Sequence, residues 1–353
     1  MKGSDSLPSS DSTAVLNSEF LRKRNAGFRR ILTFERDYPE LMKFTTDGGQ
    51  PYWLMVRWYL SRIVHDKLNG TQTCIRNLQP KLRKKHWFGF CWRSMTDLIW
   101  LFRGASHEIV FLSTGVGNLK TNKGFVNRLT DAMAECFPDI TLIVEKHDAL
   151  RYHRPRKYAR VRAFGGFQVL DQLGARIGRM SVGQQRQSAL FFKLLRACFS
   201  DVVSEEEWSW LERICQGKVK GEALAKVYYD WFLNQLQPKV LLLEDGHYGG
   251  SGHVILAARR KGVPVAEYQH GLISINHEAY NFHPSLLHRG IKAHLPDYFL
   301  TYGEYWSSLV STTAHCRAVG NPYLDSVLQE LTSPEVKANS VLFLSAAMDN
   351  ERY

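Results

Sequence analysis

The chain has 353 residues, of which 44% are hydrophobic and 12% aromatic, so it can bury a large core and is long enough for two domains. This composition excludes a wholly disordered protein. The six cysteines form no CxxC motif and no paired spacing, which excludes a disulfide framework and favours reduced thiols in a cytoplasmic protein. No apolar window reaches the roughly 18 residues of a membrane span, so we expect a cytoplasmic protein that is soluble or bound peripherally at a membrane.

The net charge of +12 is concentrated in the first third of the chain. Residues 1 to 104 contain 18 Lys and Arg against 9 Asp and Glu. The polar, Ser-rich residues 1 to 18 are predicted to be a disordered tail. Residues 19 to 104 are predicted to form a basic helical region, because apolar residues recur at helical spacing in YWLMVRWYLSRIV and MTDLIWLF.

Aromatic and basic residues are interleaved in two parts of this region. Rings at the headgroup level and cations near anionic lipids are typical of proteins that bind an anionic membrane surface. A solvated helical face over a Trp-rich core would have the same composition. Nucleic acid is a third possible partner, but no nucleic-acid motif accompanies the charge, so we expect none. The first part contains Trp53, Arg57, Trp58, Tyr59 and Arg62, and the second contains Lys81, Arg83, Lys84, Lys85, Trp87, Phe88, Phe90, Trp92 and Arg93.

Strands and helices alternate from residue 105 onward, which predicts a parallel sheet with right-handed crossovers. The apolar run EIVFLS predicts a strand, and the Gly-containing loop TGVGNLKTNKG follows it. A helix at residues 124 to 136 and a second strand, ITLIVE, complete a βαβ unit. Residues 150 to 236 are predicted to be largely helical, and Pro238 ends the last helix.

The alternation is clearest after Lys239, where four more strands are expected. A long loop over residues 272 to 295 separates the second of these strands from the third, and loops of this length are usually functional. In chain order the elements are the strand KVLLLED, the turn GHYGGSG, the helix HVILAARRKG, the strand VPVAEYQHG, the long loop, the strand PDYFLTYG, a helix from Glu304 and the strand CRAVG.

We therefore expect an α/β protein with a Rossmann-like domain over residues 105 to 322. A polar connector over residues 323 to 339 follows it. The apolar run VLFLS, within residues 340 to 353, predicts the first strand of a second Rossmann-like domain. A lone parallel strand cannot bury itself, so we expect most of that second domain to be missing from this chain.

Two of the predicted strands end on polar residues, at the edge where parallel sheets bind ligands. An imidazole can exchange a proton near neutral pH as a general chemical property, so His270 is a candidate general base, an acceptor-binding group or a structural histidine. Glu267 either orients His270 or pairs with Arg259 or Arg260. Asp245 ends the preceding strand and either lies near His270 or caps the following turn.

A series of five segments resembles the bacterial surface-polysaccharide glycosyltransferases of GT-B architecture, which act in capsule, O-antigen and other lipopolysaccharide biosynthesis. The segments, in order over roughly residues 105 to 345, are LLEDGHYGGSGH, VPVAEYQHGLISINHEAYNF, LPDYFLTYGEYW, AVGNPYLD and VLFLS. The resemblance implies two Rossmann-like domains that face a cleft, with the acceptor held mainly by the first and the nucleotide-sugar donor mainly by the second. It implies sugar transfer to a lipid-linked acceptor. No cofactor or metal is expected, because helix N-termini and basic side chains can stabilise the departing diphosphate.

This chemistry assigns roles to the candidate residues. His270, Glu267 and Asp245 form the catalytic set. The turn GVGN lacks the full spacing of a phosphate-binding motif, so it is expected only to line the cleft. His247 and His253 lack the other ligands of a metal site. The acceptor-binding candidates are Gln269, Gly271, His277, Tyr280, Asn281, His247 and Tyr248, and the cleft-lining candidates are Gly115, Gly117, Asn118 and Asn321.

Two other functions fit parts of the sequence. The ending VGNPYLD also resembles the sugar-nucleotide 2-epimerases, which interconvert two nucleotide sugars without an acceptor. The second alternative is a non-catalytic module that binds the acceptor at the membrane and works with a separate catalytic chain. Analysis of the products separates these alternatives from a transferase.

Overall fold

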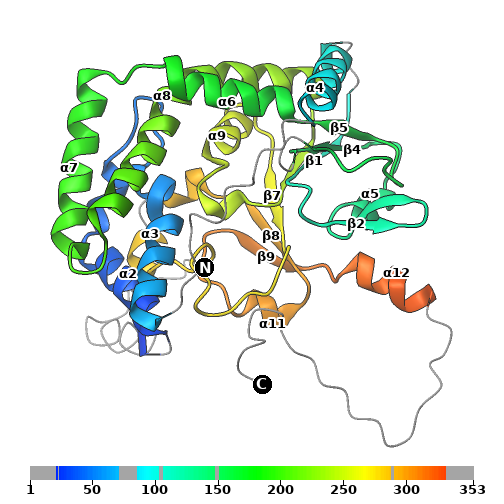
Figure 1. Ribbon diagram of the computed structural model, residues 1–353. Coiled ribbons are helices and arrows are strands. Elements are labelled where there is room, and N and C mark those ends of the chain that lie inside the picture. Colours follow the sequence, from blue (N-terminus) through cyan, green and yellow to red (C-terminus); the bar gives the residue numbers. More distant parts are fainter. Residues whose placement is uncertain are drawn as a thin grey trace, which may run out of the picture.

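The structure, a computed structural model, describes residues 21–22, 24–70, 86–102, 106–147, 151–287 and 290–330. The predicted tail over residues 1 to 18 and the predicted strand within residues 340 to 353 lie outside this part of the chain. The described part is an α/β structure in which helices flank a seven-stranded parallel sheet, so the expected Rossmann-like domain is present (Figure 1).

The sheet has the strand order β5-β4-β1-β6-β7-β8-β9, and every neighbouring pair is parallel. Counted along the chain, this is the order 3-2-1-4-5-6-7, which extends the doubly wound Rossmann order by one strand. The order reverses between β1 and β6, and such sheets bind ligands outside the carboxyl ends of the strands at this switch point. The strands are β1 (Ile109–Ser113), β4 (Thr141–Glu145), β5 (Val161–Ala163), β6 (Val240–Leu243), β7 (Val265–Tyr268), β8 (Tyr298–Thr301) and β9 (His315–Ala318).

Both faces of the sheet are covered, which is why strands such as TLIVE and VLLL are continuous apolar runs. Helices α6 (Gly165–Ile177), α8 (Glu205–Leu236) and α9 (Gly252–Arg260) pack on one face, which we call the α8 face. The short helix α5 (Asp131–Glu135) packs on the other, the α5 face. Figure 1 shows α6, α8 and α9 on one side of the strands and α5 on the other.

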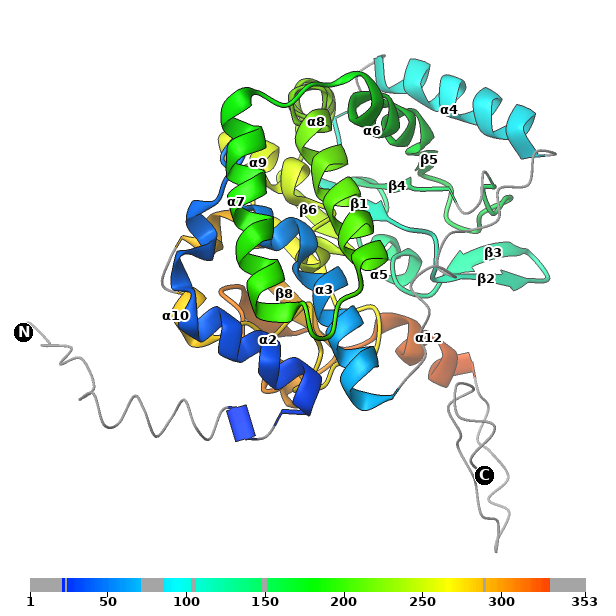
Figure 2. The same cartoon turned by 60° about the vertical axis from the view of Figure 1, so that its left-hand side comes forward.

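The N-terminal helices α2 (Ala26–Asp37) and α3 (Tyr52–Asn69) share a second core with α7 (Val182–Phe199) and the first half of α8. The 3-10 helix η1 (Pro39–Lys43) connects α2 to α3. Figure 2 shows these helices gathered on one side of the molecule. Trp53 and Arg57 are buried in this core. The first of the two aromatic and basic parts therefore contributes these residues to the interior, and its prediction as a membrane-binding surface is wrong for them.

Local capping fixes the ends of the two long helices. Helix α7 begins with a capping box of Ser181 and Gln184, and α8 begins with one of Ser204 and Glu207. Helix α8 ends where Gln237 adopts a left-handed conformation with φ of 47°, and the predicted stop Pro238 comes next.

One prediction for residues 105 to 236 is wrong. Residues 118 to 127 form a hairpin of β2 (Asn118–Thr121) and β3 (Gly124–Asn127), so the helix expected at 124 to 136 shrinks to α5. Gly124 has φ of 116°, which favours glycine and breaks a helix, and the added Cβ of any other residue would collide with the carbonyl of Pro155. Residues 150 to 236 are largely helical, as predicted, because α6, α7 and α8 make up most of this region. It also contains β5, which is three residues long and therefore leaves little pattern in the sequence.

The other strands predicted within the described residues are confirmed, as are α9 and the helix from Glu304, which is α11 (Glu304–Ser307). The expected polar connector over residues 323 to 339 is partly helical, because α12 (Pro322–Glu330) begins there. Asn321 accepts a hydrogen bond from the backbone N–H of Leu324 (3.2 Å), and Pro322 suits a first helical position. Two short elements, α10 (Pro284–Leu287) and η5 (Ile291–His294), lie within the long loop.

Helix α4 (Trp87–Phe102) lies beside α6 and β5 at the periphery of the molecule (Figure 2). Among the residues that the structure describes, no helix combines the length and the apolar character needed to cross a membrane.

Candidate functional site

A buried carboxylate, Glu267, organises the residues at the carboxyl end of β7. Val265 packs in the core of the α8 face, and side chains alternate along a strand, so Glu267 lies on the same face. Its side chain is fully buried. Oε2 of Glu267 accepts a hydrogen bond from the backbone N–H of His247 (2.9 Å) and also bonds Nδ1 of the His247 ring. Oε1 accepts a hydrogen bond from the hydroxyl of Tyr280 (2.8 Å).

Two tyrosine hydroxyls hold His270 at this edge. The hydroxyl of Tyr280 is 3.5 Å from Nδ1 of His270, and the hydroxyl of Tyr248 is 3.3 Å from Nε2. The Tyr248 hydroxyl is also 3.2 Å from Nε2 of His277. Both nitrogens of a half-buried imidazole are therefore engaged. We call His247, Tyr248, Glu267, His270, His277 and Tyr280 the histidine cluster, and all six are residues that the sequence singled out.

The structure corrects the expected partner of Glu267. Its imidazole partner is His247, and the Tyr280 hydroxyl links it to His270. The alternative ion pairs are also wrong, because Arg259 pairs with Asp297 (2.9 Å) and Arg260 with Asp230 (2.8 Å). The reason is geometric: β7 ends at Tyr268, so His270 lies beyond the pleat that fixes the direction of Glu267.

A buried arginine supports the loop that carries His277 and Tyr280. Arg57 of α3 donates hydrogen bonds to the carbonyls of Glu278 and Asn281, and it forms an ion pair with Glu35. Asn281 is itself buried, and its amide donates to the carbonyls of Ser274 and His277, so it braces the loop from within. The sequence placed Arg57 on a surface, and the apolar residues on both sides of it in WLMVRWYL were the available sign of burial.

Asp245 lies at the switch point, after β6. Its Oδ2 is 3.2 Å from Nζ of Lys146, and its Oδ1 accepts a hydrogen bond from the hydroxyl of Ser251 (3.0 Å). Burial raises the pKa of Asp245, but the Lys146 charge and these hydrogen bonds outweigh it and hold the pKa below its ordinary value. The strands β6 and β7 are adjacent, yet the hydrogen bonds of the Asp245 carboxylate go to Lys146 and Ser251 rather than to His270. Lys146 was not among the site residues predicted from the sequence, although it directly follows the predicted strand ITLIVE.

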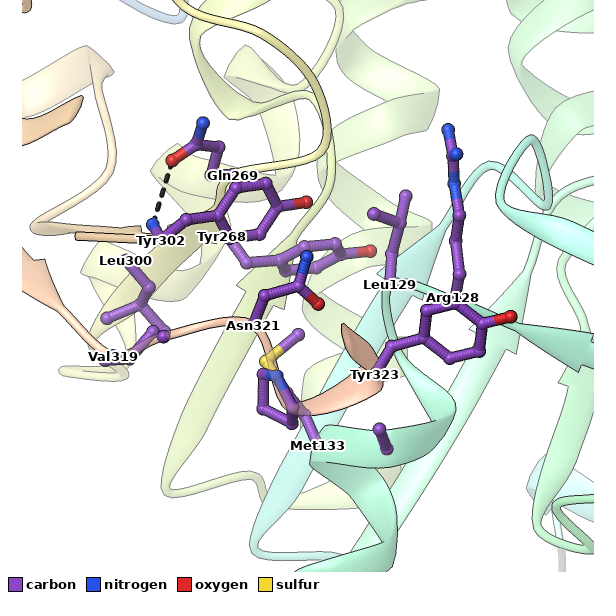
Figure 3. Close-up of a pocket in the computed structure, with 13 residues that line it drawn as sticks. Arg128, Leu129, Met133, Tyr268, Gln269, Leu300, Tyr302, Val319, Asn321 and Tyr323 are labelled. Carbon is purple, nitrogen blue, oxygen red and sulfur yellow. Dashed lines mark hydrogen bonds between the residues drawn. The ribbon is translucent and has the colours of Figure 1, made fainter. Parts of the chain in front are cut away.

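Gln269 and Asn321 come together in a narrow cavity on the α5 face, at the carboxyl ends of β7, β8 and β9 (Figure 3). Oε1 of Gln269 accepts a hydrogen bond from the backbone N–H of Tyr302 (2.9 Å), and its Nε2 donates to the carbonyl of Gly271 (2.9 Å). Tyr268 and Tyr323 also line this cavity. These two predicted residues therefore lie on the opposite face of the sheet from Glu267.

Gly115, Gly117 and Asn118 form a third group, which attaches the β2–β3 hairpin to the sheet. Nδ2 of Asn118 donates to Oε2 of Glu145 (3.0 Å), and Gly115 has φ of 75°. Glu145 also pairs with Arg156. This polar network supports the hairpin on the α5 face and is separate from the histidine cluster.

The chain was compared with models of known protein families and with curated proteins, and neither comparison finds a match. Over the described ranges, no group of three or more His, Cys, Asp and Glu side chains could hold a metal ion.

The stability of the protein is expected to fall as the pH is lowered from about 6.5 to 4. Burial lowers the pKa values of His253, His277 and His294 to about 4, so these side chains stay neutral in the folded state. The same histidines titrate near 6.5 when unfolded, so the unfolded state binds more protons between these pH values. Chemical denaturation at several pH values measures this slope. A His277→Asn variant is expected to show a shallower slope, and an unchanged slope would contradict the assignment.

Proposed function

We propose that the chain supplies the acceptor side of a glycosyltransferase of GT-B architecture, which transfers a sugar from a nucleotide sugar to a lipid-linked bacterial surface polysaccharide. The observation that carries the proposal is the environment of His270. A half-buried imidazole at the carboxyl edge of a doubly wound sheet is held by two tyrosines, one of which bonds a buried carboxylate. Inverting sugar transfer needs such a base to take the proton of the acceptor hydroxyl.

The hydrogen bonds suggest how His270 serves as this base. Nδ1 of the neutral His277 ring accepts the backbone N–H of Ala279 (3.4 Å), so Nε2 of His277 carries the proton and donates it to the Tyr248 hydroxyl. The hydroxyl proton of Tyr248 is then donated to Nε2 of His270, which therefore presents a lone pair. A substrate hydroxyl that takes the place of the Tyr248 hydroxyl can give its proton to this nitrogen. Tyr280, held by Glu267, then steadies the other side of the imidazole.

Product analysis tests the function. The full-length protein is incubated with radiolabelled nucleotide sugars and membranes that carry lipid-linked acceptors. Transfer of label to the lipid fraction, dependent on both donor and acceptor, is the expected result. Interconversion of nucleotide sugars without an acceptor would indicate an epimerase. Binding of the lipid-linked acceptor without turnover would indicate a non-catalytic module. Either of these results would contradict the proposal.

A lipid-linked acceptor lies in a membrane, so we propose that the protein binds an anionic membrane surface. Helix α4 would contact this surface. Phe88, Trp92, Met95 and Ile99 are 81%, 65%, 63% and 51% exposed, and their i, i+4, i+7 and i+11 spacing places them on one stripe of the helix. The other side of α4 packs against α6 and β5. The basic residues Lys81, Arg83, Lys84 and Lys85 directly precede the helix in sequence and lie outside the described residues.

A double substitution, Trp92→Glu with Met95→Glu, is expected to weaken binding to vesicles rich in phosphatidylglycerol by at least about tenfold. Each lost apolar side chain removes roughly 1.5–3 kcal/mol of burial free energy. Vesicle flotation measures the binding, and Val227→Glu is the matched control because Val227 is an exposed apolar residue of another helix, α8. Equal binding of vesicles by the double variant and the control would show that α4 does not contact the membrane.

A further inference from the structure

A polar cavity of about 160 Å³ lies on the α8 face, at the carboxyl ends of β4, β1 and β6. This place is the switch point of the sheet, where the strand order reverses between β1 and β6. Phe164 and Val254 are among the apolar residues that line it. Its polar lining consists of Lys146, Gln168, Asp171, Tyr229, Asp245 and Ser251.

The polar lining keeps hydrogen-bonding capacity after its internal bonds are made. Nζ of Lys146 has three N–H groups, and it donates one of them to Asp245. Oε1 of Gln168 accepts the backbone N–H of His147 (3.1 Å), which leaves both N–H groups of Nε2 for another partner. Oδ1 of Asp171 accepts the hydroxyl of Tyr228, which leaves its second oxygen as an acceptor. Among the described residues, the lining thus offers both donors and acceptors to a ligand.

Charge and size limit what can bind there. Lys146 compensates Asp245, and Asp171 adds a second carboxylate, so the cavity disfavours an anionic group such as a phosphate. Burial raises the pKa of Asp171. A volume of about 160 Å³ is below the roughly 300–1,000 Å³ of pockets for drug-sized ligands, and it holds about five water molecules at ~30 Å³ each.

We propose that this cavity binds one neutral, hydroxyl-rich ring, such as a single sugar unit of the acceptor, with Asp171 and Asp245 accepting hydrogen bonds from its hydroxyls and Lys146 donating to them. The proposal deepens the function proposed above and rests on it for the source of the ring. Asp245 lines the cavity and follows β6, and β6 pairs with β7, which leads to His270. A ring held here therefore lies at the same carboxyl edge of the sheet as the proposed base.

Binding to the purified chain tests the site directly. Saturation-transfer NMR is recorded with a neutral hexose, the corresponding hexuronate and inorganic phosphate as probes. The neutral hexose is expected to bind, and Asp171→Asn is expected to weaken it about tenfold or more, while the asparagine can still accept the Tyr228 hydroxyl. Gly250→Val is a second, steric variant, because Gly250 lines the cavity and a Cβ there meets no atom within 4 Å. It is expected to reduce binding similarly.

Asp230→Asn is the control, because Asp230 lies on α8 outside the cavity and pairs with Arg260. Its binding is expected to equal that of the wild type, and thermal melts verify that each variant is folded. Preference for the hexuronate or phosphate over the neutral hexose would overturn the proposal, as would unchanged binding in folded Asp171→Asn and Gly250→Val.

The two proposals fail in different ways. If the full-length protein transfers sugar to lipid but the neutral hexose does not bind, the cavity proposal is overturned and the transferase function stands. If the wild type binds the hexose and the cavity variants do not, while no sugar is transferred, the cavity proposal stands and the transferase function is overturned.

Discussion

Replacing Glu35 by leucine is expected to lower the free energy of unfolding by about 3–5 kcal/mol, because the substitution leaves a buried guanidinium without its carboxylate. The side chains of Arg57 and Glu35 are 3% and 0% exposed. Glu35 also accepts hydrogen bonds from the indole N–H of Trp53 (3.0 Å) and from the backbone N–H of His283 (2.8 Å). Chemical denaturation of the wild type and of Glu35→Leu measures the difference.

Arg36→Ala is the matched control for this experiment. Arg36 is the next residue of α2, and its ion pair with Asp37 is partly exposed on both sides, so its loss is expected to change stability by no more than about 1 kcal/mol. Because Arg57 holds the carbonyls of Glu278 and Asn281, Glu35→Leu should also loosen the loop that carries His277 and Tyr280. A variant as stable as the wild type would show that this ion pair does not anchor the loop.

Glu267→Leu is expected to have the second large effect, on stability and on transfer together. The leucine would leave the backbone N–H of His247 and the hydroxyl of Tyr280 without their acceptor, and each buried unpaired group costs about 1–3 kcal/mol. Tyr280 would then no longer be fixed beside His270. Denaturation and the transfer assay measure the two losses.

Tyr280→Phe separates positioning from folding, because it removes one hydroxyl and keeps the ring that packs against Phe299. We expect it to lower kcat while KM changes little, since Tyr280 acts on His270 rather than on the substrate. Glu304→Gln is the control, because Glu304 is exposed at the start of α11. If Tyr280→Phe and Glu304→Gln transferred sugar equally well, Tyr280 would have no positioning role.

The main strands could be predicted from the sequence because each is a continuous apolar run bounded by Gly, Pro or polar residues. EIVFLS and VPVAEY are examples, and their order along the chain was enough to predict a parallel sheet. β5 could not be predicted, because its three residues form a strand through their pairing with β4 rather than through a local pattern. The β2–β3 hairpin could not be predicted either, because apolar residues within 124 to 136 also match helical spacing.

The residues of the histidine cluster could be predicted, but their partners could not. His247 reaches Glu267 because the turn after β6 folds into the 3-10 helix η4 (Gly246–Tyr248) and ends at Gly249 with φ of 74°. Gly249 packs so closely on the carbonyl of Leu54 in α3 that a Cβ would collide with it. The conformation of this turn therefore depends on a helix nearly 200 residues earlier, which no local pattern encodes. The burial of Arg57 has the same long-range origin.

The most direct test of the account is the transfer assay on the full-length protein with His270→Ala, together with the affinity of that variant for the lipid-linked acceptor. His315→Ala serves as the control, because His315 is exposed on β9. General-base catalysis contributes roughly 10²–10⁴-fold, so the account predicts that His270→Ala lowers the transfer rate by about that factor while the protein stays folded and His315→Ala is unaffected. Normal transfer together with normal acceptor affinity in His270→Ala would contradict it.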